Sequence, residues 1–594
     1  MSTAILTGQP VPGSSIEDDL RSLGFDVRIA ADTTEAETLL AAVPGDRRVA
    51  VVDARFVGHL HALRLGLTDP RFPLAAVPGA VTAQPAGRQA LTRAMARENS
   101  AGGGTTLLDN LADRIVTALD ADGSAVHRPE LGSLVATVPA DAQAGSEARQ
   151  AVAAVDDEAV RLKSAVKSRD GFFTTHFISP YSRYIARWCA RRGLTPNQVT
   201  TASLITALIA AGCAATGTRA GFVAAGVLLI ASFVLDCVDG QIARYSLQYS
   251  TLGAWLDATF DRAKEYAYYA GLALGAARGG DDVWALALGA MILQTCRHVV
   301  DFSFNEANHD ATANTSPTAA LSDKLDSVGW TVWVRRMIVL PIGERWAMIA
   351  VLTAVTTPRI TFYVLLVGCA FAATYTAAGR VLRSLTRKAR RTDRAAQALA
   401  DLADNGPLAS FVARVNPGRL GAPLLIALAG TAVLAVSLFS GVTWAPVVGA
   451  LVYALTSGQA LSRPLKGALD WLVPPLFRAA EYCTVLILAV KAEVNGALPA
   501  AFGLVAAVAY HHYDTVYRIR GNAGASPAWL VRAIGGHEGR TLLVTVLAAA
   551  LTASQFTVAL TALAVAVALL VLFESIRFWV SAGAPAVHDE GEPA

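Results

Sequence analysis

The stretch "VLDCVDGQIARYSLQYSTLGAWLDATFDRAKEY", residues 234–266, decides how the fold of this chain is interpreted. It lies in one of the most apolar parts of the sequence, yet it contains four carboxylates, Asp236, Asp239, Asp257 and Asp261. An ionisable side chain inside a membrane segment is costly, so such residues are kept for a function. We therefore expect these aspartates to form a site.

The spacing of the aspartates places them in two pairs. Asp236 and Asp239 are three residues apart and Asp257 and Asp261 are four apart, so each pair shares one face of a helix. Gly253 lies one turn before Asp257 on that same face. Four bare anions in one pocket repel each other, and Mg²⁺ or Mn²⁺ relieves this repulsion and commonly completes its coordination with substrate phosphates. The alternative is a set of helix-end aspartates exposed to the cytosol.

The composition indicates a membrane protein. Of 594 residues, 53% are hydrophobic and 16% charged, and the mean hydropathy is +0.42, which is typical of a multi-span chain. The formal charge of +3 gives no sign of a nucleic-acid partner. The six cysteines are scattered without a CxxC pair, so we interpret them as reduced, buried residues.

Apolar runs predict a mainly α-helical polytopic membrane protein with about twelve transmembrane helices, arranged as two six-helix units. The first unit belongs to a domain at 165–390 and the second to residues 421–580, with a basic cytosolic linker at 391–420 between them. The predicted spans lie near 199–217, 221–244, 252–276, 283–304, 344–357, 359–383, 421–438, 442–461, 470–491, 497–516, 539–553 and 555–579.

Basic residues predict the orientation of the first unit. "RWCARRGL" precedes its first span and "RKARR" follows its sixth, so both ends are expected in the cytosol. The four aspartates then face cytosolic solutes. We expect a multi-pass protein of the plasma membrane with a cytosolic N-terminal domain and a cytosolic active site.

The remaining segments differ in character. Residues 1–125 alternate β-like and helical runs, which predicts a small soluble α/β domain with a parallel sheet. Residues 126–164 are expected to form a linker and helix, and 581–594 an acidic disordered tail. "KSRDGFFTTHFISPYSRYIARWCARRGL", from 167, mixes aromatic and basic residues at helical spacing. It predicts an amphipathic helix on the membrane surface, the alternative being an ordinary cytosolic helix.

The aspartate stretch resembles a known family. It matches, at every position, the signature D-x2-D-G-x2-A-R-x8-G-x3-D-x3-D of the CDP-alcohol phosphotransferases. The resemblance implies six transmembrane helices after an amphipathic surface helix, usually in a dimer. It also implies transfer of a phospho-alcohol unit from a CDP-linked donor to an acceptor hydroxyl, with release of CMP.

The resemblance also assigns site residues. Asp236, Asp239 and Asp257 would hold the metals, and Asp261 would be a further ligand and the general base. "LTPNQVT" resembles the entry motif of the first span, its alternative being a plain helix start after proline. The residues expected to bind the nucleotide are Pro196, Asn197, Thr200, Gly240, Ala243, Arg244 and Gly253.

Four further polar residues near the pocket are weaker candidates. If the acceptor carries a phosphate, Arg262, Lys264, Arg297 and His298 would bind it. The alternative is that they snorkel and anchor the chain at the membrane interface.

The C-terminal block resembles the first one. "SGQALSRPLKGALDWLVPPLFRAAEY" aligns with "DGQIARYSLQYSTLGAWLDATFDRAKEY" with a two-residue gap. Ser457, Val473 and Phe477 then stand where Asp239, Asp257 and Asp261 were. We predict a degenerate copy that cannot hold the metals and that takes the partner's place in an intramolecular pseudo-dimer. The alternative is twelve unrelated spans with coincidental similarity.

The N-terminal domain is reminiscent of a cytidylyltransferase fused to some members of this family, which makes the CDP-alcohol. Such an enzyme needs a glycine-rich phosphate loop with a basic residue. Here "LTGQPVPGSS" offers only Gly8 and Gly13, followed by acids. We expect a domain without that activity, kept for regulation or scaffolding.

Together these observations predict a divalent-metal-dependent membrane transferase acting in phospholipid or polyol-phosphodiester biosynthesis. Its expected partners are a CDP-alcohol donor and a hydroxyl acceptor, lipid-linked or of the inositol type. The alternative is a non-catalytic scaffold or transporter that retains a metal site. Release of CMP distinguishes the two.

Overall fold

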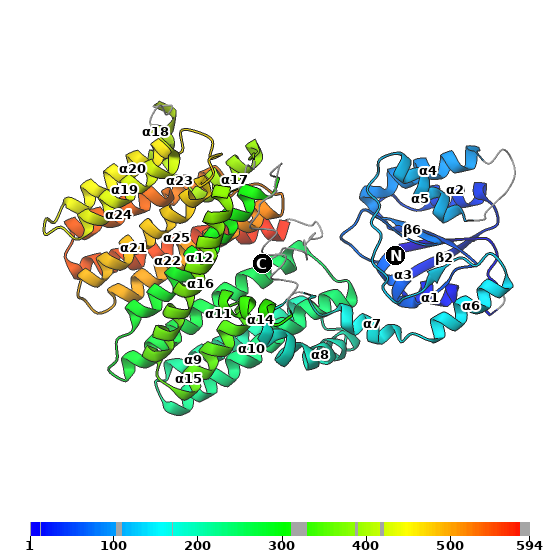
Figure 1. The fold of residues 1–594 in the computed structure, drawn as a ribbon, viewed down its shortest axis with the longest axis horizontal. Coiled ribbons are helices and arrows are strands. Elements are labelled where there is room, and N and C mark those ends of the chain that lie inside the picture. Colours follow the sequence, from blue (N-terminus) through cyan, green and yellow to red (C-terminus); the bar gives the residue numbers. More distant parts are fainter. Residues whose placement is uncertain are drawn as a thin grey trace.

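The computed structural model describes residues 2–11, 13–101, 110–168, 170–310, 329–386, 390–415 and 421–581. Figure 1 shows an α/β domain at one end of the molecule and a larger bundle of helices at the other. A short helical connection, α6 and α7, runs between the two parts. The predicted tail, 581–594, lies outside the described residues except for Ser581.

A five-stranded sheet in the order β2-β1-β3-β6-β5 forms the centre of the N-terminal domain. The strands of the domain are β1 (Ser2–Thr7), β2 (Phe25–Ala30), β3 (Val49–Asp53), β4 (Val57–Gly58), β5 (Leu74–Val77), β6 (Ala80–Ala83) and β7 (Ala136–Thr137). The helices are α1 (Ile16–Ser22), α2 (Thr33–Ala42), α3 (Leu60–Leu67), α4 (Arg88–Ala101) and α5 (Leu111–Ala121), with a 3₁₀ turn at Pro85–Gly87. Every residue of β3 is buried, as expected for a strand covered on both faces.

The predicted parallel sheet is correct only for its first three strands. β1 pairs in parallel with β2 and with β3, whereas β6 runs antiparallel to both β3 and β5. The physical reason is the short turn at Gly79, whose φ of 78° lets β5 and β6 form a hairpin instead of a crossover. The linker contains two helices, α6 (Ala142–Ala153) and α7 (Asp157–Ser164).

The first helical unit begins with a single π-helical turn, Thr174–Ile178, and an amphipathic helix, α8 (Ser179–Arg191). Tyr181, Tyr184 and Trp188 are exposed on one side of α8, while Ala186 and Cys189 are buried on the other. The remaining helices of this unit are α9 (Pro196–Ala215), α10 (Arg219–Ser246), α11 (Thr251–Arg278), α12 (Trp284–Asn308), α14 (Gly329–Val339), α15 (Ile342–Val355) and α16 (Pro358–Thr386).

The second helical unit follows the same order. Two short helices, α17 (Asp393–Ala403) and α18 (Pro407–Val415), occupy the segment that was predicted to be a linker. The longer elements are α19 (Pro423–Leu438), α20 (Ala445–Ala460), a 3₁₀ turn (Asp470–Leu472), α21 (Val473–Lys491), α22 (Ala497–Arg520), α23 (Ala528–Ala533), α24 (Gly536–Ala550) and α25 (Ala553–Ser581). A helix therefore occupies each of the twelve predicted spans.

The two helical units share one hydrophobic core. A single cluster of buried residues extends from Ile178 in the first unit to Val571 in the second. At the boundary, α12 packs on α21 and α22, and α11 packs on α22 and α25. Phe304 meets Trp471 edge-on at 5.3 Å between ring centroids, and Trp255 stacks on Trp579 at 6.3 Å.

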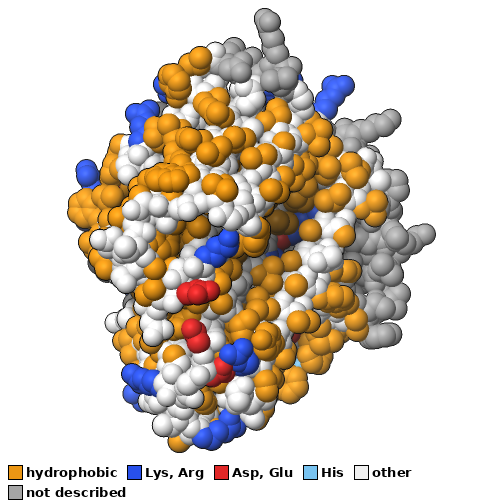
Figure 2. Space-filling view, turned by 90° about the vertical axis from the view of Figure 1, so that its left-hand side faces the viewer, with side chains coloured by type: hydrophobic (Ala, Val, Ile, Leu, Met, Phe, Trp, Pro, Cys, Tyr) orange, Lys and Arg blue, Asp and Glu red, His pale blue; other side chains and the backbone are white. Residues whose placement is uncertain are grey.

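The surface of the helical part is strongly apolar. Among the described residues, five helices are long and apolar enough to cross a membrane: Pro196–Ala215, Arg219–Ser246, Pro358–Thr386, Asp470–Lys491 and Ala553–Ser581. Figure 2 shows hydrophobic side chains spread over most of one face of the bundle, with few charged ones among them. Such exposure suits a lipid environment and indicates a multi-pass membrane protein.

Candidate active site

The four aspartates lie where α10 ends and α11 begins. Asp236 and Asp239 are on the last turns of α10, and Asp257 and Asp261 are on the first turns of α11. A short loop reverses the chain between these helices. Leu247 ends α10 in the left-handed conformation, with φ of 52° and its N–H donating to Ala243 O, and the Ser250 side chain caps α11 by accepting from Gly253 N.

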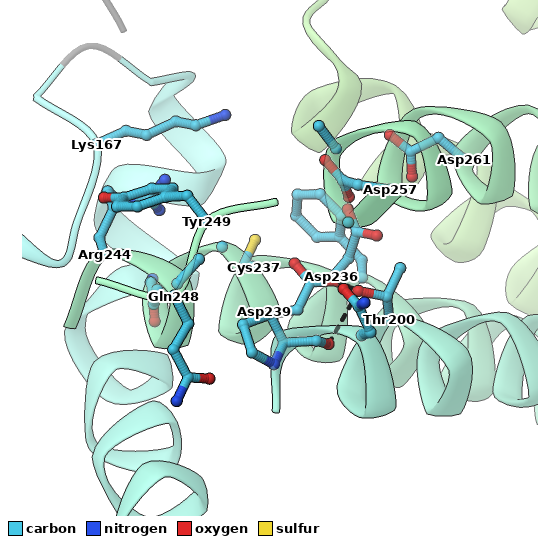
Figure 3. Close-up of a pocket in the computed structure, with 18 of the residues that line it drawn as sticks. Lys167, Thr200, Asp236, Cys237, Asp239, Arg244, Gln248, Tyr249, Asp257 and Asp261 are labelled. Atoms are coloured by element: carbon cyan, nitrogen blue, oxygen red, sulfur yellow. Dashed lines mark hydrogen bonds between the residues drawn. The ribbon is translucent and has the colours of Figure 1, made fainter. Parts of the chain in front are cut away.

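Three of the four carboxylates form one cluster. Oxygens of Asp236, Asp257 and Asp261 lie within 4.8 Å of one another. Asp239 is buried beside them, and its carboxylate accepts a hydrogen bond of 2.6 Å from the Thr200 hydroxyl. Figure 3 shows these side chains directed toward one cavity from two neighbouring helices. The predicted convergence of the aspartates is therefore seen in the structure.

Lys264 compensates part of this negative charge. Its fully buried ammonium forms an ion pair with Asp261 at 2.9 Å, contacts Asp236, and donates to the Ser203 hydroxyl at 3.2 Å. Lys264 is three residues after Asp261 on the same helix, so the two side chains lie on one face. Asp257 is exposed and Asp236 and Asp261 are partly exposed, and carboxylates this close together repel each other unless a cation lies among them.

The carboxylate cluster fits a hard divalent cation. Carboxylate oxygens are the ligands that Mg²⁺ and Mn²⁺ prefer, and several of them converge here while facing a cavity that would admit substrate oxygens as further ligands. The residues that would hold the ion are Asp236, Asp257 and Asp261, with Asp239 beside them.

The cavity beside the cluster has a volume of about 370 Å³. It is lined by all seven residues that were predicted to contact the nucleotide: Pro196, Asn197, Thr200, Gly240, Ala243, Arg244 and Gly253. Gly253 has a steric reason to lack a side chain, since a Cβ there would lie 2.8 Å from the Asn197 Oδ1 and 2.9 Å from the Ser250 Oγ. It therefore lets α9 and α11 approach closely at the cavity.

The four predicted acceptor-binding residues do not line this cavity. Arg262 pairs with Glu265 at 2.9 Å and faces the ring of Tyr513 in the second unit. Arg297 donates to the Val339 carbonyl, and His298 contacts Gln294 and Tyr513. Lys264 is directed at the aspartates. Their partners are protein groups, and a role in acceptor binding stays a prediction.

Other residues line the cavity that were not singled out from the sequence. They are chiefly Lys167 and Asp170 before α8, and Gln248 and Tyr249 in the loop between α10 and α11. Figure 3 shows Lys167, Arg244 and Tyr249 on the opposite side of the view from Asp257 and Asp261. Gln248 and Tyr249 fall in the eight-residue spacer of the aspartate pattern, where the pattern accepts any residue.

The residues of the second unit that the predicted alignment places opposite the aspartates lie in the protein interior. Ser457, Val473 and Phe477 are fully buried and carry no carboxylate. Phe477 stacks on His537 with ring centroids 4.4 Å apart, and the Tyr453 hydroxyl contacts the same histidine at 2.7 Å. Within the described residues, the only cluster of three or more potential metal ligands is the one in the first unit.

Comparison with known proteins identifies two regions of the chain. Residues 193–373 match the family model described as CDP-alcohol phosphatidyltransferase, and this segment contains all four aspartates. Residues 393–594 match a model described as a family of unknown function (DUF5941). The prediction of a CDP-alcohol transferase domain is thus confirmed for the first region.

Several curated proteins are similar over part of this domain. A phosphatidylinositol phosphate synthase of Streptomyces avermitilis is 35% identical over 131 residues, which is 21% of this chain and 51% of that protein. Its counterpart in Mycolicibacterium smegmatis is 36% identical over 122 residues, 20% of this chain and 53% of that protein. A bifunctional IPC transferase and DIPP synthase of Aquifex aeolicus is 31% identical over 114 residues, which is 19% of this chain and 26% of that protein. The chain spans about half of these relatives' length or less.

Proposed function

We propose that this protein transfers a phospho-alcohol group from a CDP-alcohol to an acceptor hydroxyl and releases CMP. The observation that carries the proposal is the convergence of Asp236, Asp257 and Asp261 at the wall of a cavity. The complete aspartate signature lies within the segment that matches the transferase family. A degenerate member would be expected to lose these closely spaced carboxylates, as the second unit lacks them.

A divalent cation held by the aspartates would neutralise the diphosphate of the donor. The protein itself supplies the base and the framework. The Asp261 carboxylate accepts the proton of the acceptor hydroxyl, whose oxygen then forms a bond to the phosphorus that bears the alcohol. The bond from this phosphorus to the bridging oxygen breaks, and CMP leaves with the electron pair. Lys264, fixed between Asp261 and Asp236, positions both carboxylates.

For the acceptor we propose an inositol-type alcohol. Two of the similar proteins are phosphatidylinositol phosphate synthases, and a third is an archaetidylinositol phosphate synthase of Pyrococcus horikoshii, 29% identical over 113 residues. The donor would be CDP-diacylglycerol or a soluble CDP-polyol. The apolar surface of the helical part favours a lipid-linked substrate that reaches the cavity from the bilayer.

We propose that the second unit is a degenerate copy of the first and serves as its intramolecular partner. Both units contain the same buried triad of two arginines and a glutamate. In both units a glutamate on the fifth long helix also accepts backbone N–H groups from a segment before the first long helix, at Phe173 in the first unit and at the start of α18 in the second. These groups are Arg262, Glu265, Arg345 and Glu344 in the first unit and Arg478, Glu481, Arg540 and Glu538 in the second.

The topology that we propose has all twelve long helices in the plasma membrane. The basic segments before α9 and after α16 place both ends of the first unit in the cytosol. The cavity then opens toward cytosolic solutes, and the N-terminal domain lies on the same side.

The test is CMP release by the purified, detergent-solubilised chain. Mg²⁺ is added with a panel of CDP-alcohols and acceptors, beside an Asp261→Asn variant. The control is Asp281→Asn, in the same unit but beyond the opposite end of α11, where Asp281 pairs with Arg359. We expect metal-dependent CMP from one donor–acceptor pair, lost in Asp261→Asn and kept in Asp281→Asn. No CMP from any pair, with the fold intact, would favour the scaffold or transporter alternative.

A further inference from the structure

The N-terminal part of the chain contacts two tyrosines where the two aspartate-bearing helices are joined, one in the last turn of α10 and one in the loop that follows it. The guanidinium of Arg161, on α7, lies 3.5 Å from the ring centroid of Tyr245 and donates to the Tyr245 carbonyl at 2.8 Å. The guanidinium of Arg71, in the N-terminal domain, lies 4.0 Å from the ring centroid of Tyr249. The two tyrosines flank the turn at which α10 ends, so the N-terminal part holds both sides of this turn.

Arg71 is held rigidly for this contact. Its guanidinium forms three hydrogen bonds to the buried carboxylate of Asp69, the shortest at 2.8 Å, and its backbone N–H donates a fourth at 3.0 Å. The neighbouring Phe72 stacks flat on His127, with ring centroids 3.5 Å apart. The hydrogen bonds to Asp69 already restrict the guanidinium, so it loses little conformational entropy when it packs on an aromatic ring.

Tyr249 also lines the cavity of the candidate active site. Arg71 is not among the described residues that line it, so Arg71 contacts Tyr249 from the side of the N-terminal domain. Figure 3 shows Tyr249 beside Arg244, across the view from Asp257 and Asp261. The carboxylate end of the cavity would attract the metal-bound diphosphate of a donor. The nucleoside then faces the end that Tyr249, Gln248 and Arg244 form.

From this placement we propose that Tyr249 stacks on the nucleobase of the CDP-alcohol and that Arg71 positions Tyr249 for that contact. This inference rests on the proposed function, because it takes the donor to be a cytidine diphosphate. It assigns the N-terminal domain a role in donor binding that needs no nucleotidyltransferase activity. Stacking of a base on an aromatic ring is a common source of affinity in nucleotide recognition.

The test separates donor binding from turnover in the full-length, detergent-solubilised chain. Calorimetric titration measures CMP affinity with Mg²⁺, and CMP release gives kcat and the KM for the donor and for the acceptor. The variants are Tyr249→Ala, Tyr249→Phe and Arg71→Ala. The matched control is Arg28→Ala, because Arg28 also pairs with an aspartate two residues earlier, Asp26, but both are exposed.

We expect Tyr249→Ala to raise the donor KM and to weaken CMP binding by about 10-fold or more, as for loss of one base stack. Tyr249→Phe keeps the ring, so its donor KM and CMP affinity should stay within about 3-fold of the wild-type values. Arg71→Ala should raise the donor KM by about 2- to 5-fold, the usual size of one cation–π contact. The acceptor KM should not change in any of these variants, and Arg28→Ala should behave as the wild type.

Two results would overturn the inference. One is Tyr249→Ala with the donor KM and CMP affinity of the wild type. The other is a donor KM of Arg71→Ala that equals the donor KM of Arg28→Ala. If the wild type binds CMP but releases none from any donor, the proposed function fails while CMP affinity still tests Tyr249. If the wild type neither binds nor releases CMP, both proposals fail.

Discussion

The two helical units carry the same buried charge framework but differ in the residues beside it. In each unit, an arginine on the third long helix pairs with a glutamate three residues later, and an arginine on the fifth long helix completes the triad. The distances within the triads are 2.9 and 3.2 Å in the first unit and 2.8 and 2.5 Å in the second. The triads are Arg262, Glu265 and Arg345 in the first unit, and Arg478, Glu481 and Arg540 in the second.

The carboxylates that converge on the cavity occur in one unit alone. Asp261 lies one turn before Glu265, whereas Phe477 occupies the equivalent position before Glu481 and is buried against His537. This difference separates two uses of buried charge. The triads are buried networks in which two arginines share one glutamate, and removing one member leaves the others with an uncompensated buried charge. The aspartates carry excess negative charge, which destabilises the fold unless a bound cation or substrate compensates it.

The largest effect should come from removing one carboxylate of the cluster. Asp236→Asn should lower metal-dependent CMP release by about 10³-fold, the scale of losing a main electrostatic contributor at an active site. The equivalent loss cannot occur in the second unit, where Ser457→Ala, at the position aligned with Asp239, should leave the rate unchanged. Initial rates at saturating Mg²⁺ check this. A rate in Asp236→Asn near that of the wild type would contradict the assignment of the cluster.

Breaking a triad should affect stability instead of chemistry. Arg478→Met leaves Glu481 with one arginine in place of two in a fully buried site, which should cost about 3 kcal/mol of unfolding free energy. Thermal unfolding in detergent measures the loss. The folded fraction should retain the donor KM of the wild type. A variant of normal stability that fails to bind the donor would mean that the second unit takes part in chemistry directly.

A smaller effect is expected from filling the close contact at Gly253. In Gly253→Ala, the new Cβ would meet the Asn197 Oδ1 at 2.8 Å, so Asn197 must shift within the cavity. We expect about a 10-fold increase in the donor KM, in line with the loss of one well-placed contact. Gly539→Ala in the second unit is the control, because its Cβ would meet nothing within 4 Å. Equal donor KM values in the two variants would argue against a tight cavity wall at Gly253.

The smallest effect should arise from removing a single hydroxyl at the boundary between the units. The Tyr513 hydroxyl of the second unit contacts His298, and the ring faces Arg262. Tyr513→Phe removes the hydroxyl and keeps the ring, so it should cost about 1 kcal/mol of stability. Tyr513→Ala, the comparison variant, also removes the buried ring with its cation–π contact and leaves a cavity, so it should cost about 3 kcal/mol or more. Calorimetric unfolding measures both changes, and equal values in the two variants would show that the ring contributes nothing.

The aspartate pattern and hydrophobic periodicity predicted much of this arrangement. The positions of twelve helices follow from long apolar runs, because a chain in lipid must satisfy its backbone within each helix. The convergence of the aspartates follows from their helical spacing. The antiparallel β5–β6 hairpin was missed because the sequence has only a two-residue turn at Pro78 and Gly79 to mark it. Helices α17 and α18 were missed because they are only 11 and 9 residues long, too short to stand out as spans.

The sequence by itself determined the membrane class, the helix order and the identity of the carboxylates, since these depend on composition and local spacing. Only the tertiary structure decided which charges face the cavity. Lys264 was predicted to contact the acceptor, but its place on α11 directs its ammonium into the aspartate cluster. The contact between Tyr249 and Arg71, which are far apart in the chain, was visible only in the structure. Contacts between distant segments depend on how the elements pack, and no local pattern in the sequence records them.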